Sequence, residues 1–454
     1  MAVKANSIDM VNGPLWLKIL KFAALYMLTA ALQNLYSVAD VIVVGRYAGA
    51  NALAGVGTCT VLINLFLNFI LGFSAGATIV LGQAIGARSL SDVSKASHTA
   101  IAVACIGGFV IMAISLIFTK QLLNMIDVPE EVMPEASSYL RVVSFGFIPS
   151  LIYNFGAGIL RAKGDTKRAL CIVLVSGIIN LLLNLLFVCV FKMGAAGVGC
   201  ATVISQLFTA VSIMFILLTE PDETRIELKK IRIYKEPFFK ILKFGLPSGI
   251  QSAAYSASNV IVQSSINGFG AAAIAGSSAV SSITDVYNTM ANSLYQAAIV
   301  FVSQNYGAKK FDRIKKSILI CMTYLLVVWA IQASVTYLFG KALLGLYVPN
   351  DPEALLWGLR KFNVVGYFYG ILGIMNIMSG ALRGIGASFA NMLTSIAGVC
   401  GIRILWIVTA FKAIGTFESL FLCYPLSWIG TTLMHIVMFT ILFRKEKKQL
   451  QQAE

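Results

Sequence analysis

The feature that most constrains this chain is a series of long apolar stretches separated by short polar segments. A helix that crosses a bilayer needs about 20 mostly apolar residues, because lipid cannot satisfy an exposed backbone. Of the 454 residues, 58% are hydrophobic and only 12% are charged, which is too few charges to cover a soluble protein. The sequence therefore predicts an all-α polytopic membrane protein with twelve transmembrane helices. The predicted spans are residues 15–44, 52–83, 97–119, 136–160, 169–191, 195–219, 238–266, 272–304, 317–340, 357–382, 389–411 and 416–443.

Lysine and arginine are distributed unevenly between the segments that connect these spans. With both termini placed in the cytoplasm, 26 of them fall on the cytoplasmic side and 8 on the outer side. Cytoplasmic loops of membrane proteins carry such an excess. We therefore expect a multi-pass protein of the plasma (inner) membrane with cytoplasmic termini. The net charge of +15 then indicates contact with anionic lipid rather than with nucleic acid.

The two halves of the chain repeat each other. Five short segments recur in the same order 220 to 222 residues later, namely residues 18–22, 49–55, 83–88, 128–129 and 158–161. Each half contains six predicted spans, an even number, so both halves enter the membrane with the same polarity, as parallel repeats do. We therefore expect two six-helix bundles around a central cleft.

The longest polar segment lies between the halves and marks the predicted domain boundary. The N-terminal lobe is predicted over residues 1–220 and the C-terminal lobe over residues 240–443. A cytoplasmic linker, residues 221–239, joins them, and a basic cytoplasmic tail follows at residues 444–454. Such an architecture favours alternating access, in which two bundles rock about a site near the middle of the membrane.

Four motifs resemble those of the multidrug and toxic compound extrusion (MATE) family in order and spacing. They are LYSVADVIVVGRYAGANALAG at residues 35–55, GQAIGAR at 82–88, LRAKGDT at 160–166 and Leu246-Pro247. The resemblance implies a secondary active antiporter that exports organic, cationic or amphipathic compounds in exchange for H⁺ or Na⁺. It implies neither enzymatic activity nor a cofactor, and the sequence has no phosphate-binding Gly-x-x-x-x-Gly-Lys-Ser/Thr loop. We expect a monomer whose partners are the small-molecule substrate and the bilayer.

Two alternatives compete with this interpretation. One is a lipid-linked oligosaccharide flippase of the same superfamily, which commonly has extra spans or several arginines in its cavity. Here only Arg403 lies within a predicted span once the arginines counted with the flanking segments are set aside. The other is a membrane-embedded enzyme or scaffold. The two histidines, His98 and His435, have no catalytic partner at a suitable spacing, so we interpret them as structural.

Once the residues grouped with the flanking segments are set aside, three ionisable residues remain within predicted spans, Asp40, Asp285 and Arg403. Each costs about 2.5–3.5 kcal/mol at a helix centre, so each needs a partner or a function. Gln33 and Ser37 share a helix face with Asp40, with Asn34 beside it. The resemblance implies that Asp40 binds the coupling ion; the alternative is a structural contact between helices. Apart from a possible Na⁺ at Asp40, we expect no metal site.

The predicted fifth and sixth spans add three polar candidates, Asn180, Asn184 and Thr202. The family pattern in the fifth span is Asn-x-x-x-Asp, so Asn184 replaces the usual acid. An amide oxygen can ligate sodium but cannot take up a proton. The site is thus predicted to carry a single carboxylate, Asp40, which slightly favours proton coupling.

The C-terminal half supplies most candidates for the substrate cleft. Asp285 is interpreted either as a transport residue or as the partner of Arg403 in a buried ion pair. The remaining candidates are polar, aromatic or methionine side chains that can adapt to varied ligands. They are Asn34, Gln251, Tyr255, Asn259, Asn288, Tyr287 and Met290.

Overall fold

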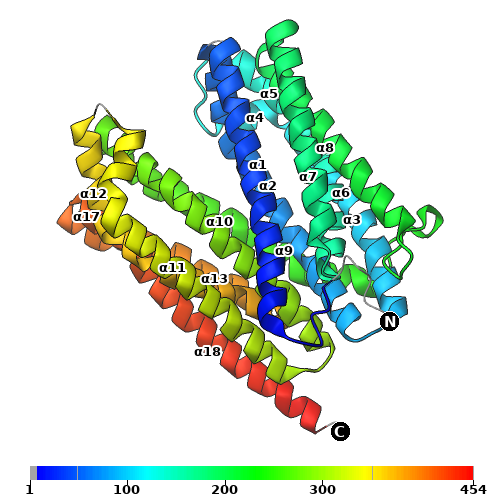
Figure 1. The fold of residues 1–454 in the computed structure, drawn as a ribbon. Coiled ribbons are helices and arrows are strands. Elements are labelled where there is room, and N and C mark those ends of the chain that lie inside the picture. Colours follow the sequence, from blue (N-terminus) through cyan, green and yellow to red (C-terminus); the bar gives the residue numbers. More distant parts are fainter. Residues whose placement is uncertain (1–7, 49, 350, 453–454) are drawn as a thin grey trace. The chain divides into compact units, whose positions relative to one another are not determined.

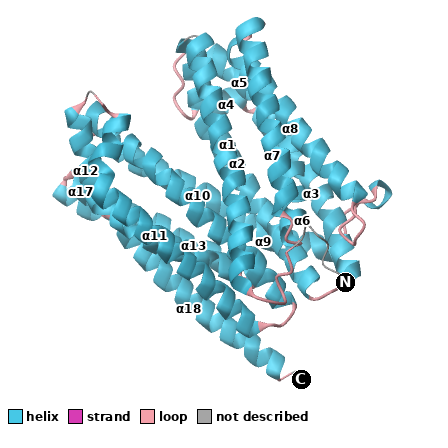
Figure 2. Cartoon of the chain, viewed as in Figure 1, coloured by secondary structure: helices cyan, strands magenta, loops and turns pink. Residues whose placement is uncertain are grey.

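The computed structural model describes residues 8–48, 50–349 and 351–452. Within these ranges the chain is helical almost throughout, with short loops and no β-strand (Figure 2). The first half contains α1 (Leu15–Tyr47), α2 (Ala50–Gly86), α3 (Leu90–Ile117), α4 (Thr119–Asn124), α5 (Met133–Ser144), α6 (Phe147–Ala162), α7 (Thr166–Asn184), the π-helix η1 (Leu185–Val190), α8 (Gly194–Thr219) and the short η2 (Leu228–Lys230).

The second half begins with the long helices α9 (Lys235–Asn267), α10 (Ala271–Gly307) and α11 (Phe311–Tyr347). A broken helix follows, consisting of α12 (Pro352–Val365), η3 (Gly366–Phe368) and α13 (Tyr369–Gly384). The next is irregular throughout: α14 (Ser388–Ser395), η4 (Ile396–Gly401), α15 (Ile402–Trp406), η5 (Ile407–Phe411) and α16 (Lys412–Ile414). The described chain ends with α17 (Phe417–Phe421) and α18 (Cys423–Gln451).

The structure contains a helical segment at each predicted transmembrane position. Among the described residues, 9 helices are long and apolar enough to cross a membrane, and α5 with α6, bent by 45°, forms a tenth. The other two are α9 and α10, which have 33 and 37 residues but contain many Ser, Asn and Gln side chains. The protein is therefore an all-α polytopic membrane protein with twelve membrane-spanning segments.

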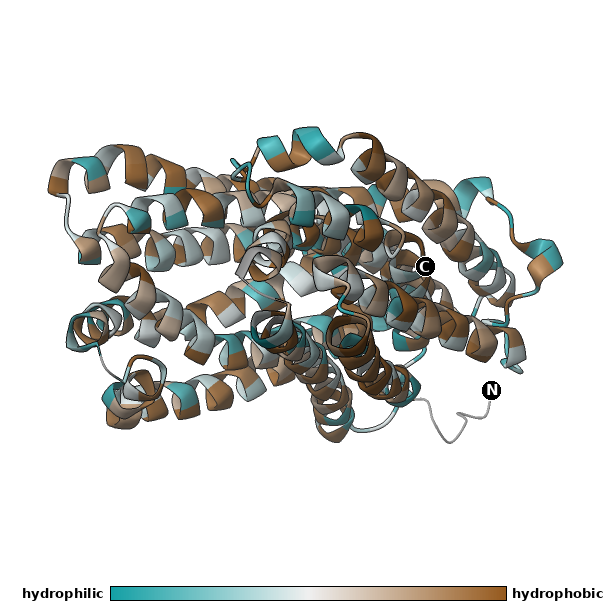
Figure 3. Cartoon of the chain, turned by 90° about the horizontal axis from the view of Figure 1, so that it is seen from above, coloured by the Kyte–Doolittle hydropathy of each residue, from teal (hydrophilic) through white to brown (hydrophobic). Residues whose placement is uncertain are grey.

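The lateral surface of the helices is apolar. Hydrophobic residues run along the helices, whereas hydrophilic residues gather mainly at helix ends and loops (Figure 3). Ile117, Phe215 and Leu338 are each more than 60% exposed. Exposed apolar surface on this scale would aggregate in water and is stable against lipid.

The same packing pattern occurs in both halves. In the first half α2 contacts α3, α5 and α6, and α3 also contacts α6. In the second half α10 contacts α11, α12 and α13, and α11 also contacts α13 (Figure 1). The order of these helices along the chain is the same, which agrees with the predicted duplication.

The two compact units of the structure differ in their bounds from the predicted lobes. One unit holds Leu28–Gly249 with the short stretch ending at Asp9, and the other holds Met10–Met27 with Ile250–Glu454. The first turns of α1 thus belong with the second half, where Phe22 packs edge-on against Phe301 at 6.0 Å. A helix of 33 residues is about 50 Å long, so its two ends can pack against different neighbours.

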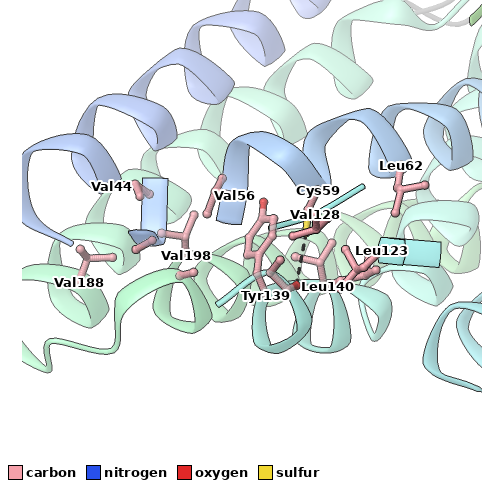
Figure 4. Packing of buried hydrophobic residues seen from close by; sticks show 14 of the residues in the cluster. Val44, Val56, Cys59, Leu62, Leu123, Val128, Tyr139, Leu140, Val188 and Val198 are labelled. Atoms are coloured by element: carbon pink, nitrogen blue, oxygen red, sulfur yellow. Dashed lines mark hydrogen bonds between the residues drawn. The ribbon is translucent and has the colours of Figure 1, made fainter. Parts of the chain in front are cut away.

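A buried apolar cluster fixes the position of α1 in the first unit. It combines Val43 and Val44 of α1 with Val56 and Cys59 of α2, and it includes the aromatic ring of Tyr139 from α5 (Figure 4). The Cys59 thiol donates a hydrogen bond to the Ala136 carbonyl at 3.3 Å. Because Val43 and Val44 lie about one turn from Asp40, this cluster also holds Asp40 in place.

Ionic side chains join one end of α6, α7 and α8. Lys163 contacts Glu220 at 2.6 Å and Asp222 at 2.7 Å. Partial burial raises the pKa of Asp222, but its hydrogen bonds with Lys163 and Thr224 outweigh this, so its pKa lies below the ordinary value. A carboxylate with a lowered pKa stabilises the fold above its unfolded-state pKa and loses that contribution as pH falls through the folded-state value.

Two pairs of glycines bring α2 and α9 into backbone contact. A Cβ added to Gly76 would lie 2.5 Å from the Gly245 nitrogen, and one added to Gly72 would lie 2.5 Å from the Ser248 carbonyl oxygen. Gly72 and Gly76 are four residues apart, as are Gly245 and Gly249. Small residues at this spacing allow close helix approach in membranes.

We expect Gly76→Ala to lower the melting temperature of the purified protein, because overpacking a tight contact costs about 1–3 kcal/mol. Gly57→Ala is the matched control on the same helix, since a Cβ there would meet nothing within 4 Å. Thermal unfolding followed by tryptophan fluorescence measures both variants. Equal melting temperatures for Gly76→Ala and the wild type would contradict the assigned contact.

Candidate functional site

The first unit contains a polar cluster between α1 and α7, centred on Asp40. The Asn184 amide nitrogen donates a short hydrogen bond to the Asp40 carboxylate and a second one, of 3.2 Å, to the Asn180 side-chain oxygen. Asn184 is fully buried and Asn180 is 7% exposed. Among the described residues no lysine or arginine pairs with Asp40, so its carboxylate faces the neutral amide of Asn184.

The cluster continues from α7 into α8. The Asn180 amide donates to the Ser205 hydroxyl at 3.4 Å, and that hydroxyl donates to the Thr202 carbonyl at 2.9 Å. Two buried oxygens have no hydrogen-bond partner, the side-chain oxygens of Asn184 and Thr202. Buried polar atoms are normally satisfied, so these oxygens indicate room for a proton donor or a cation. The structure thus brings together the first and fifth spans, with the sixth beside them.

Asn184 stands where the α-helical hydrogen bonding of α7 ends and the π-helix η1 begins. A π-helical turn is uncommon and occurs frequently at functional sites. In the second half η5 occupies the corresponding position, about 222 residues later. The irregularity is therefore part of the repeated unit and places Asn184 on locally altered backbone.

The other predicted residues of α1 do not join the cluster. Gln33, Asn34 and Ser37 are exposed, and the Ser37 hydroxyl donates to the Gln33 carbonyl of its own helix at 3.3 Å. The neighbouring Tyr36 makes the interhelical contact, donating to the Leu174 carbonyl of α7 at 3.1 Å. Its spacing of four residues from Asp40 could have identified it, because residues at this spacing share a helix face.

The second unit contains a polar cluster around Gln251 of α9. The Gln251 oxygen accepts from Arg383 at 2.8 Å and from Asn391 at 2.9 Å. Its amide nitrogen donates to Ser395 at 2.9 Å and to Tyr255 at 3.3 Å. Gln251, a predicted cleft residue, is 3% exposed and connects four side chains within this unit.

The two histidines occupy buried structural positions. The Nε2 atom of His435 lies 3.0 Å from the Ser395 hydroxyl, so His435 extends the Gln251 cluster. The Nε2 atom of His98 accepts from the Glu227 backbone at 2.9 Å and thereby attaches the polar segment after α8.

The ion pair between Asp285 and Arg403, one of the two alternatives that the sequence left open, is not formed. Arg403 donates to Asn259 at 3.0 Å and to Ser427 at 3.2 Å, and its guanidinium lies 4.5 Å from the centre of the Tyr424 ring. Asp285 is exposed on α10 and accepts from Asn288 at 3.4 Å. Charge complementarity between two spans suggested the pair, but packing turns the side chains toward different neighbours.

Two further cations are buried in this unit, although the charge count had assigned both to loops. Lys361 is 7% exposed and donates three hydrogen bonds of 2.9 Å to Ser277 and Ser281 of α10. Arg383 is 4% exposed. Hydropathy assigned both residues to loops because each lies at the end of an apolar run. For Lys361 the sequence signal is the pair Ser277 and Ser281, which lie one helical turn apart.

The remaining cleft candidates divide by burial. Tyr287 is 2% exposed and donates to the Tyr369 carbonyl at 2.8 Å, so it connects α10 to α13. Tyr255, Asn288 and Met290 are half-buried, and Asn259 is exposed. These four can meet a ligand without rearrangement of the unit.

A repeated six-helix unit with a polar cluster inside each copy defines a multi-span membrane transporter. The family model described as MatE matches residues 26–186 and 247–409, once in each half. The chain therefore belongs to the multidrug and toxic compound extrusion family, as its motifs predicted.

Relatives and solved structures agree with this assignment. The chain is 27% identical to the probable multidrug resistance protein YoeA of Bacillus subtilis, over 86% of this chain and 85% of YoeA. It is 22% identical to the FAD transporter of Shewanella oneidensis, over 86% of this chain and 87% of that protein. An outward-facing multidrug resistance MATE transporter has the same fold, with a TM-score of 0.89 and 19% identity over 99% of this chain and all of that one.

We expect Asn184→Asp to make the thermal stability of the protein depend on sodium. The substitution places a second carboxylate against Asp40, which is unfavourable without a cation and provides a second charged ligand with one. Each tenfold gain in sodium affinity adds about 1.4 kcal/mol of stability at saturating sodium. Melting temperatures measured in sodium and in choline chloride test this.

Asn34→Asp is the control for that substitution, because it adds a carboxylate at an exposed position of α1. Its sodium response should match that of the wild type. An Asn184→Asp variant with the wild-type sodium response would exclude α7 from the ion site.

Proposed function

We propose that this protein is a secondary active antiporter that exports amphipathic organic compounds across the plasma membrane in exchange for H⁺ or Na⁺. The observation that carries the proposal is the environment of Asp40, a carboxylate in a membrane-spanning helix that contacts a neutral amide. The proposal includes a monomer with cytoplasmic termini that needs no cofactor and catalyses no chemical reaction.

The chemistry of coupling follows from this environment. A carboxylate paired with arginine would hold a permanent partner and could not exchange ions. Asp40 can bind and release a proton or a sodium ion, because its present partner is the neutral amide of Asn184. Binding of either ion neutralises the negative charge of Asp40, which lowers the free-energy cost of holding this side chain inside the membrane. A change of this kind can bias a protein between two conformations.

The orientation of Asn184 favours the proton as the coupling ion. Its amide nitrogen faces Asp40, and its oxygen has no hydrogen-bond partner. Sodium requires oxygen ligands, so sodium binding at Asp40 would need the amide to turn its oxygen toward the ion. Protonation of Asp40 needs no such rotation of Asn184. The Asn184 amide nitrogen would then face the neutral carboxylic acid of Asp40.

A second candidate, a lipid-linked oligosaccharide flippase, is favoured by one observation. The sequence predicted Arg403 as the one arginine inside a span. In the structure Arg383 and Lys361 are buried in the second unit as well. Positive side chains suit the phosphates of such lipids. The names of the relatives support an exporter of soluble compounds, and one of them, an FAD transporter, carries a phosphate-containing compound.

We expect Asp40→Asn to abolish gradient-driven efflux while leaving folding intact. The amide keeps the shape of the side chain and can still meet Asn184, but it cannot take up a proton. Dye efflux from proteoliposomes, driven separately by a proton gradient and by a sodium gradient, measures the effect. We expect wild-type efflux under the proton gradient and background efflux for the variant.

Asp312→Asn is the matched control, because Asp312 is exposed in the first turn of α11. It should retain wild-type rates. Normal proton-driven efflux by Asp40→Asn would exclude Asp40 as the coupling residue, and efflux by the wild type under sodium alone would reverse the choice of ion.

A further inference from the structure

We infer that the second unit holds a binding site for the anionic group of the exported compound, centred on Arg403 of α15 with Asn259 and Tyr424 beside it. The ligand class is an amphipathic organic anion that carries a carboxylate or a phosphate. This inference rests on the proposed export function and specifies its substrate class.

Arg403 is a buried cation with neutral partners. Its side chain is 5% exposed and contacts the oxygens of Asn259 and Ser427 and the face of the Tyr424 ring. Within the described ranges no carboxylate lies within 4.0 Å of its guanidinium. A buried charge is costly unless it is paired, and these dipoles offset only part of that cost. An anion would complete the pairing.

A second arginine lies on the same face of α9. Arg383 donates to Gln251, and its Nε atom is buried with no hydrogen-bond partner. Gln251, Tyr255 and Asn259 are spaced by four residues and so follow one helix face. Arg383 and Arg403 thus contact residues two turns apart on this face, Gln251 and Asn259.

The described acids of the unit have other partners or lie at the surface. Asp285 accepts from Asn288. Asp351 accepts from the Ala354 backbone, Glu353 accepts from Trp357, and Asp312 is exposed at the start of α11. Glu418 pairs with Arg360 at 3.7 Å, and Glu446 accepts from Tyr306 at 2.8 Å. The positive potential around Arg403 is thus not cancelled by a neighbouring carboxylate, which leaves an anionic ligand as the complementary group.

The site lies on the same pair of repeated helices as the Asp40 cluster, about one turn away. Asp40 contacts Asn184, 144 residues later, and Asn259 contacts Arg403, also 144 residues later. At the repeat offset of 222 residues, Asp40 corresponds to Val262 and Asn184 to Trp406, each three residues after Asn259 and Arg403. The two halves therefore carry opposite charges close to, but not at, equivalent positions.

The residues around Arg403 are less buried than Arg403 itself. Asn259 is exposed, and Tyr255 and Tyr424 are half-buried, so we expect an anionic group to reach Arg403 past Asn259. The Tyr424 ring stacks on Phe421 at 6.2 Å and contacts Trp428 at 5.7 Å. A charged group beside an aromatic surface suits an amphipathic anion rather than a small inorganic one.

Binding of two matched dyes tests the inference. Rhodamine B carries a free carboxylate, and its ethyl ester is the same molecule without that charge. Fluorescence anisotropy with the full-length protein in phosphatidylcholine nanodiscs should show tighter binding of rhodamine B. Arg403→Gln should weaken rhodamine B binding by about tenfold to hundredfold, the range for a charge-assisted hydrogen bond. It should leave binding of the ester unchanged.

Arg360→Gln is the control, because Arg360 is 42% exposed in the same unit. A second variant covers the case in which Arg403→Gln does not fold. Asn259→Asp places a carboxylate 3.0 Å from Arg403, the distance of the present contact. It should raise the melting temperature and abolish the preference for rhodamine B, because the protein then supplies its own anion.

Three results would overturn the inference. They are equal wild-type affinity for the two dyes, an Asn259→Asp variant no more stable than the wild type, and unchanged rhodamine B binding in Arg403→Gln. Adding phosphatidylglycerol to the nanodiscs separates a lipid headgroup from a soluble anion. Competition that vanishes in Arg403→Gln would assign the site to lipid and overturn the substrate assignment. Equilibrium binding needs no gradient, so a failure of ion coupling at Asp40 would leave these results intact.

Discussion

A polar group inside a bilayer has no water to bind, and this constraint determines most of the structure. The backbone meets it by forming helices throughout the described chain. Polar side chains meet it by bonding to one another between helices, as Asn184 does with Asp40 and Gln251 with Arg383. The interhelical side-chain hydrogen bonds thus lie at polar clusters, and apolar packing such as the cluster around Cys59 fills the space between helices.

The duplicated units carry opposite charges on corresponding helices, at positions about one turn apart. In the first unit an acid on α1 faces an amide on α7, and in the second an amide on α9 faces an arginine on α15. Within the described residues, neither charge forms a salt bridge with a protein counter-ion. The proposed cation site of the first unit and the proposed anion site of the second would therefore differ in charge on a shared backbone geometry.

The π-helical segments lie beside the polar residues of both units. The first unit has one after Asn184, and the second has two, which flank Arg403 on both sides. A π-helical turn shifts the side chains that follow it around the helix axis and leaves part of the backbone hydrogen bonding irregular. Both charged sites therefore lie beside the least regular parts of otherwise continuous helices.

The amino-acid sequence by itself determined the twelve spans, the duplication and the family. Each follows from local hydropathy or from motif order, which do not depend on how helices pack. The sequence also identified Asp40, Asn180 and Asn184, because intramembrane polar residues are rare. Only the tertiary structure decided their partners: it excluded the pairing of Asp285 with Arg403, left Gln33 and Ser37 exposed while Tyr36 contacts α7, and buried Lys361 and Arg383. Partner choice depends on helix rotation and crossing, which are set by contacts between residues more than a hundred positions apart, and no local pattern encodes them.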